Sequence, residues 1–278
     1  MSVEARYAFL RQLSADAGAM ALDFWRRRSE LIVELKGTAD FVSHADRAVE
    51  EMIRASIARA FPEDAFLGEE TSAGFAGQHE RLWIVDPIDG THNFLRGIPY
   101  WNVSIAYVER GVRTLGAICD PVAGSVYHAM RGGGAWISDG RSETRLSTST
   151  TSGITGAIVC VGHHDRVPDR RYLTLRAALM EACASFRNFG CAALQLAHVA
   201  EGRYDAYVEL DLSSWDAMAG LLLIEEAGGC VGPFPGPGGL TVRAPVIGCA
   251  KGVAEALRAL LKDGAGVSLD GVTSLVSA

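Results

Sequence analysis

The sequence predicts an α/β fold in two halves, an α+β half over residues 1–146 and a layered α/β half over residues 147–278. Three observations support this prediction. Apolar residues repeat at helical spacing near the N-terminus, short apolar segments separated by turn residues follow, and strands alternate with helices after the polar stretch 147–152. A chain of 278 residues is also long enough to bury a large core.

The first half opens with two amphipathic helices. Apolar side chains at three- and four-residue spacing predict a helix over about 3–27 and a second over about 44–60, which begins at a Ser43–Asp46 capping signal. Short apolar segments bounded by turn residues then predict an antiparallel sheet. Its strands are expected at 65–67, 82–85, 103–108, 114–119, 126–130 and 135–138.

The second half alternates between strand and helix patterns, which is typical of layered α/β structure. Strands are expected at 157–161, 204–208 and 245–248, and helices at 170–184, 192–200, 215–227 and 253–261. Gly228–Gly229 is a glycine stop signal for the third of these helices. Residues after 262 carry only a weak pattern.

Composition argues against two classes of partner. The net charge is −7, from 26 basic and 33 acidic residues, so no electrostatic footprint for nucleic acid is visible. No apolar run reaches the ~18–20 residues of a membrane span, and residues 1–27 lack the unbroken apolar segment of a signal peptide. The six cysteines are scattered without a Cys-x-x-Cys pair. We therefore expect a cytoplasmic protein with reduced thiols and neither a nucleic-acid nor a membrane partner.

The strongest chemical signal is the segment Asp86-Pro87-Ile88-Asp89-Gly90-Thr91, directly after a buried strand. Two carboxylates three residues apart on a proline-stiffened turn can face one point. The glycine lets the backbone approach a ligand, and the threonine can cap a helical turn whose N–H groups suit a phosphate. The same residue types also occur in ordinary acidic turns, so this motif alone leaves both interpretations open.

Two further acids strengthen the functional interpretation. Glu69 follows a short apolar strand, and Asp216 lies in the first turn of a predicted helix, where the helix dipole alone would favour an acid. Carboxylates gathered without histidine or cysteine ligands suit Mg²⁺ rather than Zn²⁺. Two such ions about 3.5–4 Å apart can activate water and stabilise the leaving oxygen of a phosphoryl displacement.

The order and spacing of these motifs resemble the inositol monophosphatase family, over about residues 36–248. The resemblance rests on Glu69–Glu70, Asp86–Phe94, and Trp215–Asp216 followed by Glu226–Gly229. It implies a layered αβαβα sandwich of the inositol monophosphatase/fructose bisphosphatase type, with the metal site between the halves. It also implies phosphate-monoester hydrolysis with two or three Mg²⁺ ions, sensitivity to Li⁺, and a homodimer. The aromatic residues Tyr100, Trp101 and Trp136 are consistent with a dimer interface or with core positions.

The resemblance also implies roles for individual residues. The implied metal ligands are Glu69, Asp86, Asp89, Asp216 and the backbone carbonyl of Ile88. The implied catalytic residues are Glu69, Thr91 and Asp46, the last two orienting the attacking water; a helix-start acid is the alternative for Asp46. The implied substrate contacts are Gly90, Thr91, Cys191, Glu209 and Asp216.

Two of these substrate contacts depart from the family pattern or have a plain alternative. Cys191 stands where the family commonly has serine, so a good hydrogen-bond partner is lost. Glu209 can also be interpreted as an exposed acid at a strand end.

The substrate stays open at this point. Inositol 1-phosphate is the first candidate, favoured by the Lys36–Asp46 segment and by this version of the Asp86–Thr91 motif. Histidinol phosphate, 3′-phosphoadenosine 5′-phosphate and fructose 1,6-bisphosphate are the alternatives, since relatives on this fold process each. A non-catalytic metal-binding relative is the remaining alternative, and it is disfavoured because every expected metal ligand is present.

Overall fold

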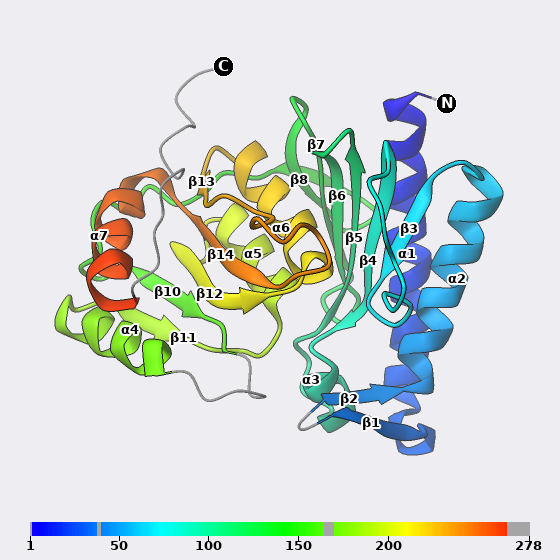
Figure 1. The fold of residues 1–278 in the computed structure, drawn as a ribbon, viewed down its shortest axis with the longest axis horizontal. Helices are drawn as coiled ribbons and strands as arrows, with labels where there is room; N and C mark the ends of the chain where they lie inside the picture. The colour runs from blue at the N-terminus through cyan, green and yellow to red at the C-terminus, as the bar shows by residue number, and fades with distance from the viewer. Residues whose placement is uncertain (1, 38–39, 164–169, 266–278) are drawn as a thin grey trace.

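The computed structural model describes residues 2–37, 40–163 and 170–265, with side chains described except at 35–37, 40–42 and 263–265. Two β-sheets are stacked with helices on both faces of each, which makes five layers in the order αβαβα (Figure 1). Three apolar clusters fill the spaces between these layers. The predicted layered α/β class is therefore confirmed.

The first sheet has seven strands in sequence order, and two long helices cover its outer face. The strands are β3 (Ala65–Gly68), β4 (Arg81–Asp89), β5 (Asn102–Glu109), β6 (Val112–Asp120), β7 (Ser125–Met130), β8 (Gly134–Ser138) and β9 (Glu143–Arg145). The helices are α1 (Val3–Arg26) and α2 (His44–Ala60). The predicted cap of α2 is present, because Asp46 accepts from the Ser43 N–H at 2.8 Å and Ser43 Oγ accepts from Ala45.

One prediction about this sheet is wrong. We expected antiparallel pairing throughout, but β3 and β4 are parallel, with Gly68 opposite Val85. The connection over residues 69–80 is long enough for the crossover that parallel strands need. As a result β3 and β4 end at the same edge of the sheet, so the residues that follow them meet there.

The second sheet has five strands in the order β11-β10-β12-β14-β13. They are β10 (Ile158–Val161), β11 (Ser185–Arg187), β12 (Ala206–Leu212), β13 (Cys230–Val231) and β14 (Ala244–Cys249). Helices α4 (Arg170–Glu181) and α7 (Ala254–Ala265) cover its outer face. Helices α5 (Ala192–Ala200) and α6 (Ser214–Glu226) lie between the two sheets (Figure 1).

Several short elements were not fully predicted from the sequence. These are the hairpin of β1 (Val33–Gly37) and β2 (Asp40–Ser43) and the strands β9, β11 and β13, while the helix α3 (Thr91–Arg96) was expected only as a helical turn after Thr91. Strands of two to five residues show little periodicity, and these five lack the apolar runs by which β3 and β10, of four residues each, were predicted. The predicted helix at 170–184 is also shorter, because α4 ends at Glu181 and β11 begins four residues later.

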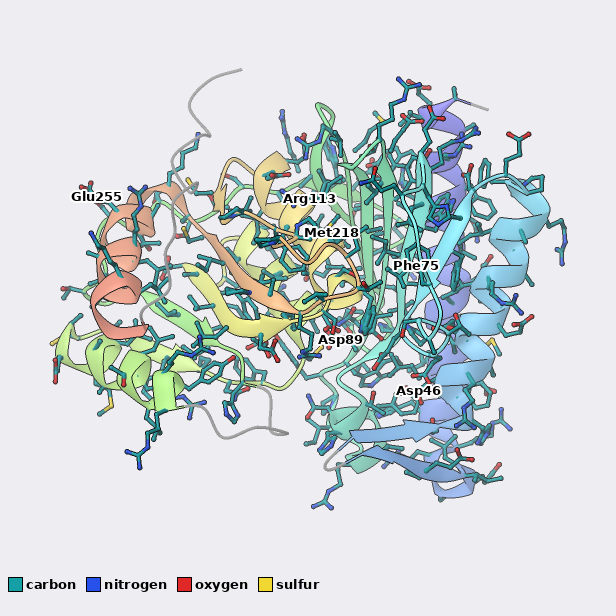
Figure 2. The ribbon with its side chains drawn as sticks, in the orientation of Figure 1. Asp46, Phe75, Asp89, Arg113, Met218 and Glu255 are labelled. Atoms are coloured by element: carbon teal, nitrogen blue, oxygen red, sulfur yellow. The ribbon has the colours of Figure 1, made fainter. Side chains whose placement is uncertain are left out.

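Helix α6 is apolar on nearly every side because it is packed between both sheets. Met218, at the centre of this layer, is 1% exposed (Figure 2). Gly116 on β6 permits the close approach, since a Cβ there would lie 3.0 Å from Ala219 backbone atoms. Trp101 is fully buried, so it belongs to the core rather than to an interface.

Four further predictions can be compared with the structure. The expected division near residue 146 falls between β9 and β10, and separate domains on its two sides stay a prediction. All six cysteines are free, and four are buried. Within the described ranges, no helix combines the length and apolar character needed to cross a bilayer. The weakly patterned tail after residue 265 lies outside the described residues.

Candidate metal centre and active site

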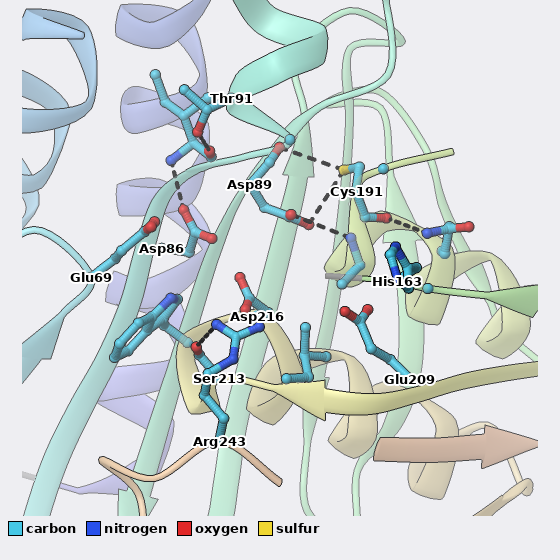
Figure 3. A pocket seen from close by; sticks show the side chains of 18 of the residues that line it. Glu69, Asp86, Asp89, Thr91, His163, Cys191, Glu209, Ser213, Asp216 and Arg243 are labelled. Carbon is cyan, nitrogen blue, oxygen red and sulfur yellow. Dashed lines mark hydrogen bonds between the residues drawn. The ribbon is translucent and has the colours of Figure 1, made fainter. Parts of the chain in front are cut away.

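A cavity of about 790 Å³ opens where the end of β4, the N-termini of α5 and α6, and the loop before β14 meet (Figure 3). Nine of the ten predicted site residues line it. They are Glu69, Asp86, Ile88, Asp89, Gly90, Thr91, Cys191, Glu209 and Asp216. The tenth, Asp46, is not among the lining residues and contacts the site through Thr91.

Three of the predicted metal ligands converge on one point. Carboxylate oxygens of Asp86, Asp89 and Asp216 all lie within 4.8 Å of one another. The ladder between β4 and β5 shifts register between Asp86 and Asp89, and this irregularity lets two acids on one strand face the same side. The sequence predicted that this strand ends at residue 85, before the motif. Strand β4 instead continues through the motif to Asp89.

Glu69 lies at the same edge of the sheet but outside this three-acid cluster. Its N–H donates to the Val85 carbonyl at 3.1 Å, which continues the parallel ladder by one residue. The N–H of the next residue, Glu70, donates to the buried carboxylate of Glu50 at 2.8 Å. Glu50 was not predicted from the sequence, and it fixes the corner that carries Glu69.

The electrostatics of the cluster indicate a cation site. Burial raises the pKa of Asp86 well above its usual range, and the nearby Glu69, Asp216 and Asp89 raise it further. Burial and then Asp216 raise the pKa of Asp89 to about 6, against hydrogen bonds that favour its charged form. Carboxylate oxygens that repel one another when no cation is bound are suitable ligands for a hard divalent ion such as Mg²⁺.

Asp89 is held by hydrogen bonds from three sides. Its Oδ2 accepts from the Ala193 N–H at 2.7 Å, from Asn102 Nδ2 at 2.9 Å and from Cys191 Sγ at 3.3 Å. The first donor belongs to the N-terminal turn of α5, whose dipole favours a carboxylate. Cys191 lines the cavity but is only 2% exposed. Its thiol therefore contacts the proposed metal ligand Asp89 from a nearly buried position.

Asp46 and Thr91 form the buried side of the site. Asp46 Oδ2 accepts from the Ser43 N–H at 2.8 Å and from Ser43 Oγ at 2.6 Å, which caps α2. Asp46 Oδ1 lies 3.5 Å from the Thr91 hydroxyl, which also lies 3.1 Å from the Ile88 carbonyl. The helix cap thus uses Oδ2 of Asp46, and the predicted role in orienting water would use Oδ1. The catalytic roles of both residues stay predictions.

The turn that carries Thr91 requires glycine at its start. Gly90 has φ +87°, and a Cβ there would lie 3.1 Å from the Cys191 Cβ and 3.3 Å from the Tyr100 carbonyl oxygen. Gly90 rather than Thr91 precedes the first turn of α3, so the expectation that Thr91 caps this helix is wrong. Thr91 is instead the first helical residue, and its hydroxyl points back towards Ile88 and Asp46.

Glu209 lies on the opposite wall of the cavity (Figure 3). It is 6% exposed, so the alternative of an exposed strand-end acid is wrong. The Tyr207 hydroxyl donates to its carboxylate. Burial raises the pKa of Glu209 to about 8, although that hydrogen bond acts in the other direction.

Sequence reasoning missed several residues that shape this site, and their signals differ. Asn102 is fully buried and bridges Asp89 and Cys191, at distances of 2.9 and 3.1 Å. A polar residue at the start of an apolar strand was a usable signal for it. Arg243 lines the cavity and donates to Ser213 Oγ at 2.8 Å, but its loop carries no pattern that would point to this contact.

Comparisons with known proteins agree on one family. A sequence model described as "Inositol monophosphatase family" matches residues 2–264. A protein named inositol-1-monophosphatase from Rhizobium meliloti is 40% identical over 249 residues, covering 88% of this chain and 91% of that relative. A protein named Nus factor SuhB from Pasteurella multocida is 36% identical over 224 residues, covering 79% of this chain and 82% of that relative. The crystal structure of extragenic suppressor protein suhB from Bartonella henselae matches with a TM-score of 0.83 and 33% identity, covering 94% of this chain and 99% of that chain.

Proposed function

This chain belongs to the inositol monophosphatase family, and from that premise we propose that it hydrolyses a small phosphate monoester with bound Mg²⁺. The observation that carries the proposal is the convergence of Asp86, Asp89 and Asp216 within 4.8 Å at the wall of a large cavity. Inositol 1-phosphate is the first candidate substrate, because the relative from Rhizobium meliloti carries that activity in its name.

The proposed metal ligands are the acids around this point. Glu69, Asp86, Asp89 and Asp216 would hold two or three Mg²⁺ ions together with the Ile88 carbonyl. Bound there, the ions would neutralise the acids and the incoming phosphate and lower the pKa of water. The donor set supports this choice, since it is made of oxygens alone and its clustered carboxylates raise the pKa of Asp86, which a bound cation would offset.

The protein residues would orient the water and the substrate. Asp46, held by Ser43, presents Oδ1 to the Thr91 hydroxyl. A threonine that donates its proton to Asp46 keeps its oxygen lone pairs for a proton of the attacking water. The water would then attack phosphorus directly, and no phosphoenzyme forms.

The far wall of the cavity would recognise the rest of the substrate. Glu209 is fixed by Tyr207, so its carboxyl group can hydrogen-bond a substrate hydroxyl at low cost in side-chain entropy. Gly90 and Thr91 would meet the phosphate at the first turn of α3. Cys191 has a thiol where serine is common; its sulfur accepts from Asn102 Nδ2 at 3.1 Å and lies 3.3 Å from Asp89 Oδ2.

The test is phosphate release from four substrates, each with Mg²⁺ and with a chelator. They are inositol 1-phosphate, histidinol phosphate, 3′-phosphoadenosine 5′-phosphate and fructose 1,6-bisphosphate. We expect release that the chelator abolishes and that is highest with inositol 1-phosphate. A higher rate on another substrate would change the substrate and keep the chemistry. Release that persists in chelator would refute the metal mechanism.

Matched variants separate the site from general effects. Asp89→Asn keeps the shape of the side chain and removes a proposed metal ligand, so we expect turnover to fall by about 100-fold or more. Glu255→Gln makes the same chemical change on the exposed face of α7 and should leave turnover unchanged (Figure 2). Near-normal turnover by Asp89→Asn would remove Asp89 from the proposed ligand set.

Two finer proposals follow from the family, and a third follows from the scattered cysteines. We propose inhibition by Li⁺, which a titration of Mg²⁺-dependent turnover checks. We propose a homodimer, which light scattering of the purified chain checks. A cytoplasmic location is the third, and cell fractionation checks it.

A second role has separate support. The relative from Pasteurella multocida is named Nus factor SuhB, a name that refers to transcription rather than to hydrolysis. We propose that this chain also acts on a transcription complex, against the expectation of no nucleic-acid partner. Adding wild-type and Asp89→Asn protein to a purified transcription elongation reaction tests this role. Equal effects of the two proteins are expected if the role is independent of hydrolysis, and the absence of any effect would refute it.

A further inference from the structure

The segment that connects Glu209 to Asp216 contains a break in the second sheet. Strands β12 and β14 pair antiparallel, with Glu209 opposite Val246, but the next pair is Leu212 with Ala244. Between these two pairs the chain moves three residues along β12 but only two along β14, so β12 contains a β-bulge. A bulge leaves backbone groups without ladder partners and redirects the strand, here directly before the helix that carries Asp216.

The side chain of Arg243 fills this break. Its Nη2 donates to the Asp211 carbonyl at 2.8 Å, and its Nε donates to Asp211 Oδ2 at 3.0 Å. Its Nη1 donates to Ser213 Oγ at 2.8 Å. The planar guanidinium thus holds both sides of Leu212, and Leu212 itself is only 4% exposed.

The contact with Ser213 matters for α6. Ser213 precedes the first turn of this helix, but its side chain makes no capping hydrogen bond. Its hydroxyl is held by Arg243 instead. On the other side of the helix start, Ser104 Oγ on β5 donates to the Trp215 carbonyl at 3.0 Å. The first turn of α6 is therefore fixed from both sheets at once.

Asp216 needs this restraint because its neighbours repel it. Its carboxylate lies within 4.8 Å of those of Asp86 and Asp89, and like charges at that distance repel one another when no cation is bound. Among the described residues that line the cavity, Arg243 is the one lysine or arginine. Figure 3 shows its guanidinium beside Ser213 and on the same side of the cavity as Asp216.

We propose that Arg243 is a positioning residue for Asp216, and that it sets the affinity of the site for Mg²⁺ by fixing the first turn of α6. The proposal rests on the metal site of the proposed function and extends it to a residue in the loop before β14. Arg243 acts through Asp211 and Ser213, so it does not need to touch the substrate.

The test measures Mg²⁺ binding directly, by calorimetric titration of metal-stripped protein without substrate. We expect Arg243→Gln to weaken binding by about 10-fold, the lower end of what supporting residues of metal ligands cost. Arg243→Lys is expected to weaken it less, because an ammonium group keeps the charge but cannot make the three contacts of the fork. Arg110→Gln, at an exposed arginine paired with Glu80, is the matched control and should bind Mg²⁺ like the wild type.

A second readout separates positioning from general stability. The rise in the thermal midpoint on adding Mg²⁺ compares each variant with itself, so a uniform loss of stability cancels. A smaller rise is expected for Arg243→Gln and an unchanged rise for Arg110→Gln. If Arg243→Gln does not fold, Ser213→Ala decides, since it removes only the Nη1 contact and should weaken Mg²⁺ binding by about threefold.

The outcomes distinguish this proposal from the proposed function. Folded Arg243→Gln or Ser213→Ala with wild-type Mg²⁺ affinity would overturn the positioning role, whatever the turnover. Wild-type protein that binds Mg²⁺ but releases no phosphate would overturn the hydrolytic function and leave the positioning role to be judged by binding. Wild-type protein that binds no Mg²⁺ would overturn both.

Discussion

Without divalent metal, the folded state of this protein should become less stable as the pH rises. Burial and Asp216 raise the pKa of Asp89 from 3.8 to about 6, so the folded chain binds this proton more tightly than the unfolded chain does. A carboxyl pKa that is raised on folding stabilises the folded state at pH values below the pKa of the unfolded chain. That stabilisation is lost as the pH rises through the pKa of the folded chain. Glu209, with its pKa raised to about 8, and Asp86 act in the same direction.

The size of the effect follows from the pKa of Asp89. Stability is lost only below the folded pKa of about 6, and from pH 5 to that pKa is one pH unit. Each pH unit over which only the folded chain holds the proton corresponds to about 1.4 kcal/mol. Asp89 should therefore lower the free energy of unfolding by on the order of 1 kcal/mol between pH 5 and pH 7.5. Glu209 adds a further loss that continues towards pH 8.

Urea denaturation of metal-stripped protein at pH 5 and pH 7.5, with chelator or with Mg²⁺, measures this directly. We expect the loss in chelator and its reversal by saturating Mg²⁺, which binds the charged carboxylates of the folded state. Asparagine at position 89 cannot titrate, so the loss of stability in Asp89→Asn should be smaller by on the order of 1 kcal/mol. Equal stability of the stripped wild type at both pH values, or an unchanged loss in Asp89→Asn, would refute the assigned cause.

Substitutions at three other positions give independent checks. Thr91→Ala should lower kcat by about 100-fold while Thr91→Ser retains most of it, because serine keeps the hydroxyl beside Asp46; equal kcat values in a steady-state assay would contradict this role. Gly90→Ala should lower the free energy of unfolding by about 1–3 kcal/mol, since φ is +87° and the new Cβ would crowd Cys191, and urea denaturation of metal-free protein measures it. Met218→Ala should cost about 2–5 kcal/mol through the cavity it leaves between the sheets, and a thermal midpoint like that of the wild type would argue against this packing.

The sequence by itself determined the long helices and the chemistry of the site. Helical spacing of apolar residues is a local property, so α1 and α2 were predicted to within a residue or two of their observed bounds. The acids at Glu69, Asp86, Asp89 and Asp216 were also visible, because each stands within a few residues of a predicted strand end or at the start of a predicted helix. Their order along the chain carried the resemblance to the family.

Only the tertiary structure decided how these residues meet. The parallel pairing of β3 with β4 brings Glu69 beside the end of β4, and no local pattern distinguishes it from antiparallel pairing. The burial of Glu209 depends on residues distant in sequence, and so does the support that Asp89 receives from Asn102 and Cys191. Arg243 reaches Asp211 and Ser213 across a bulge 30 residues away in the chain, where sequence spacing carries no information about distance.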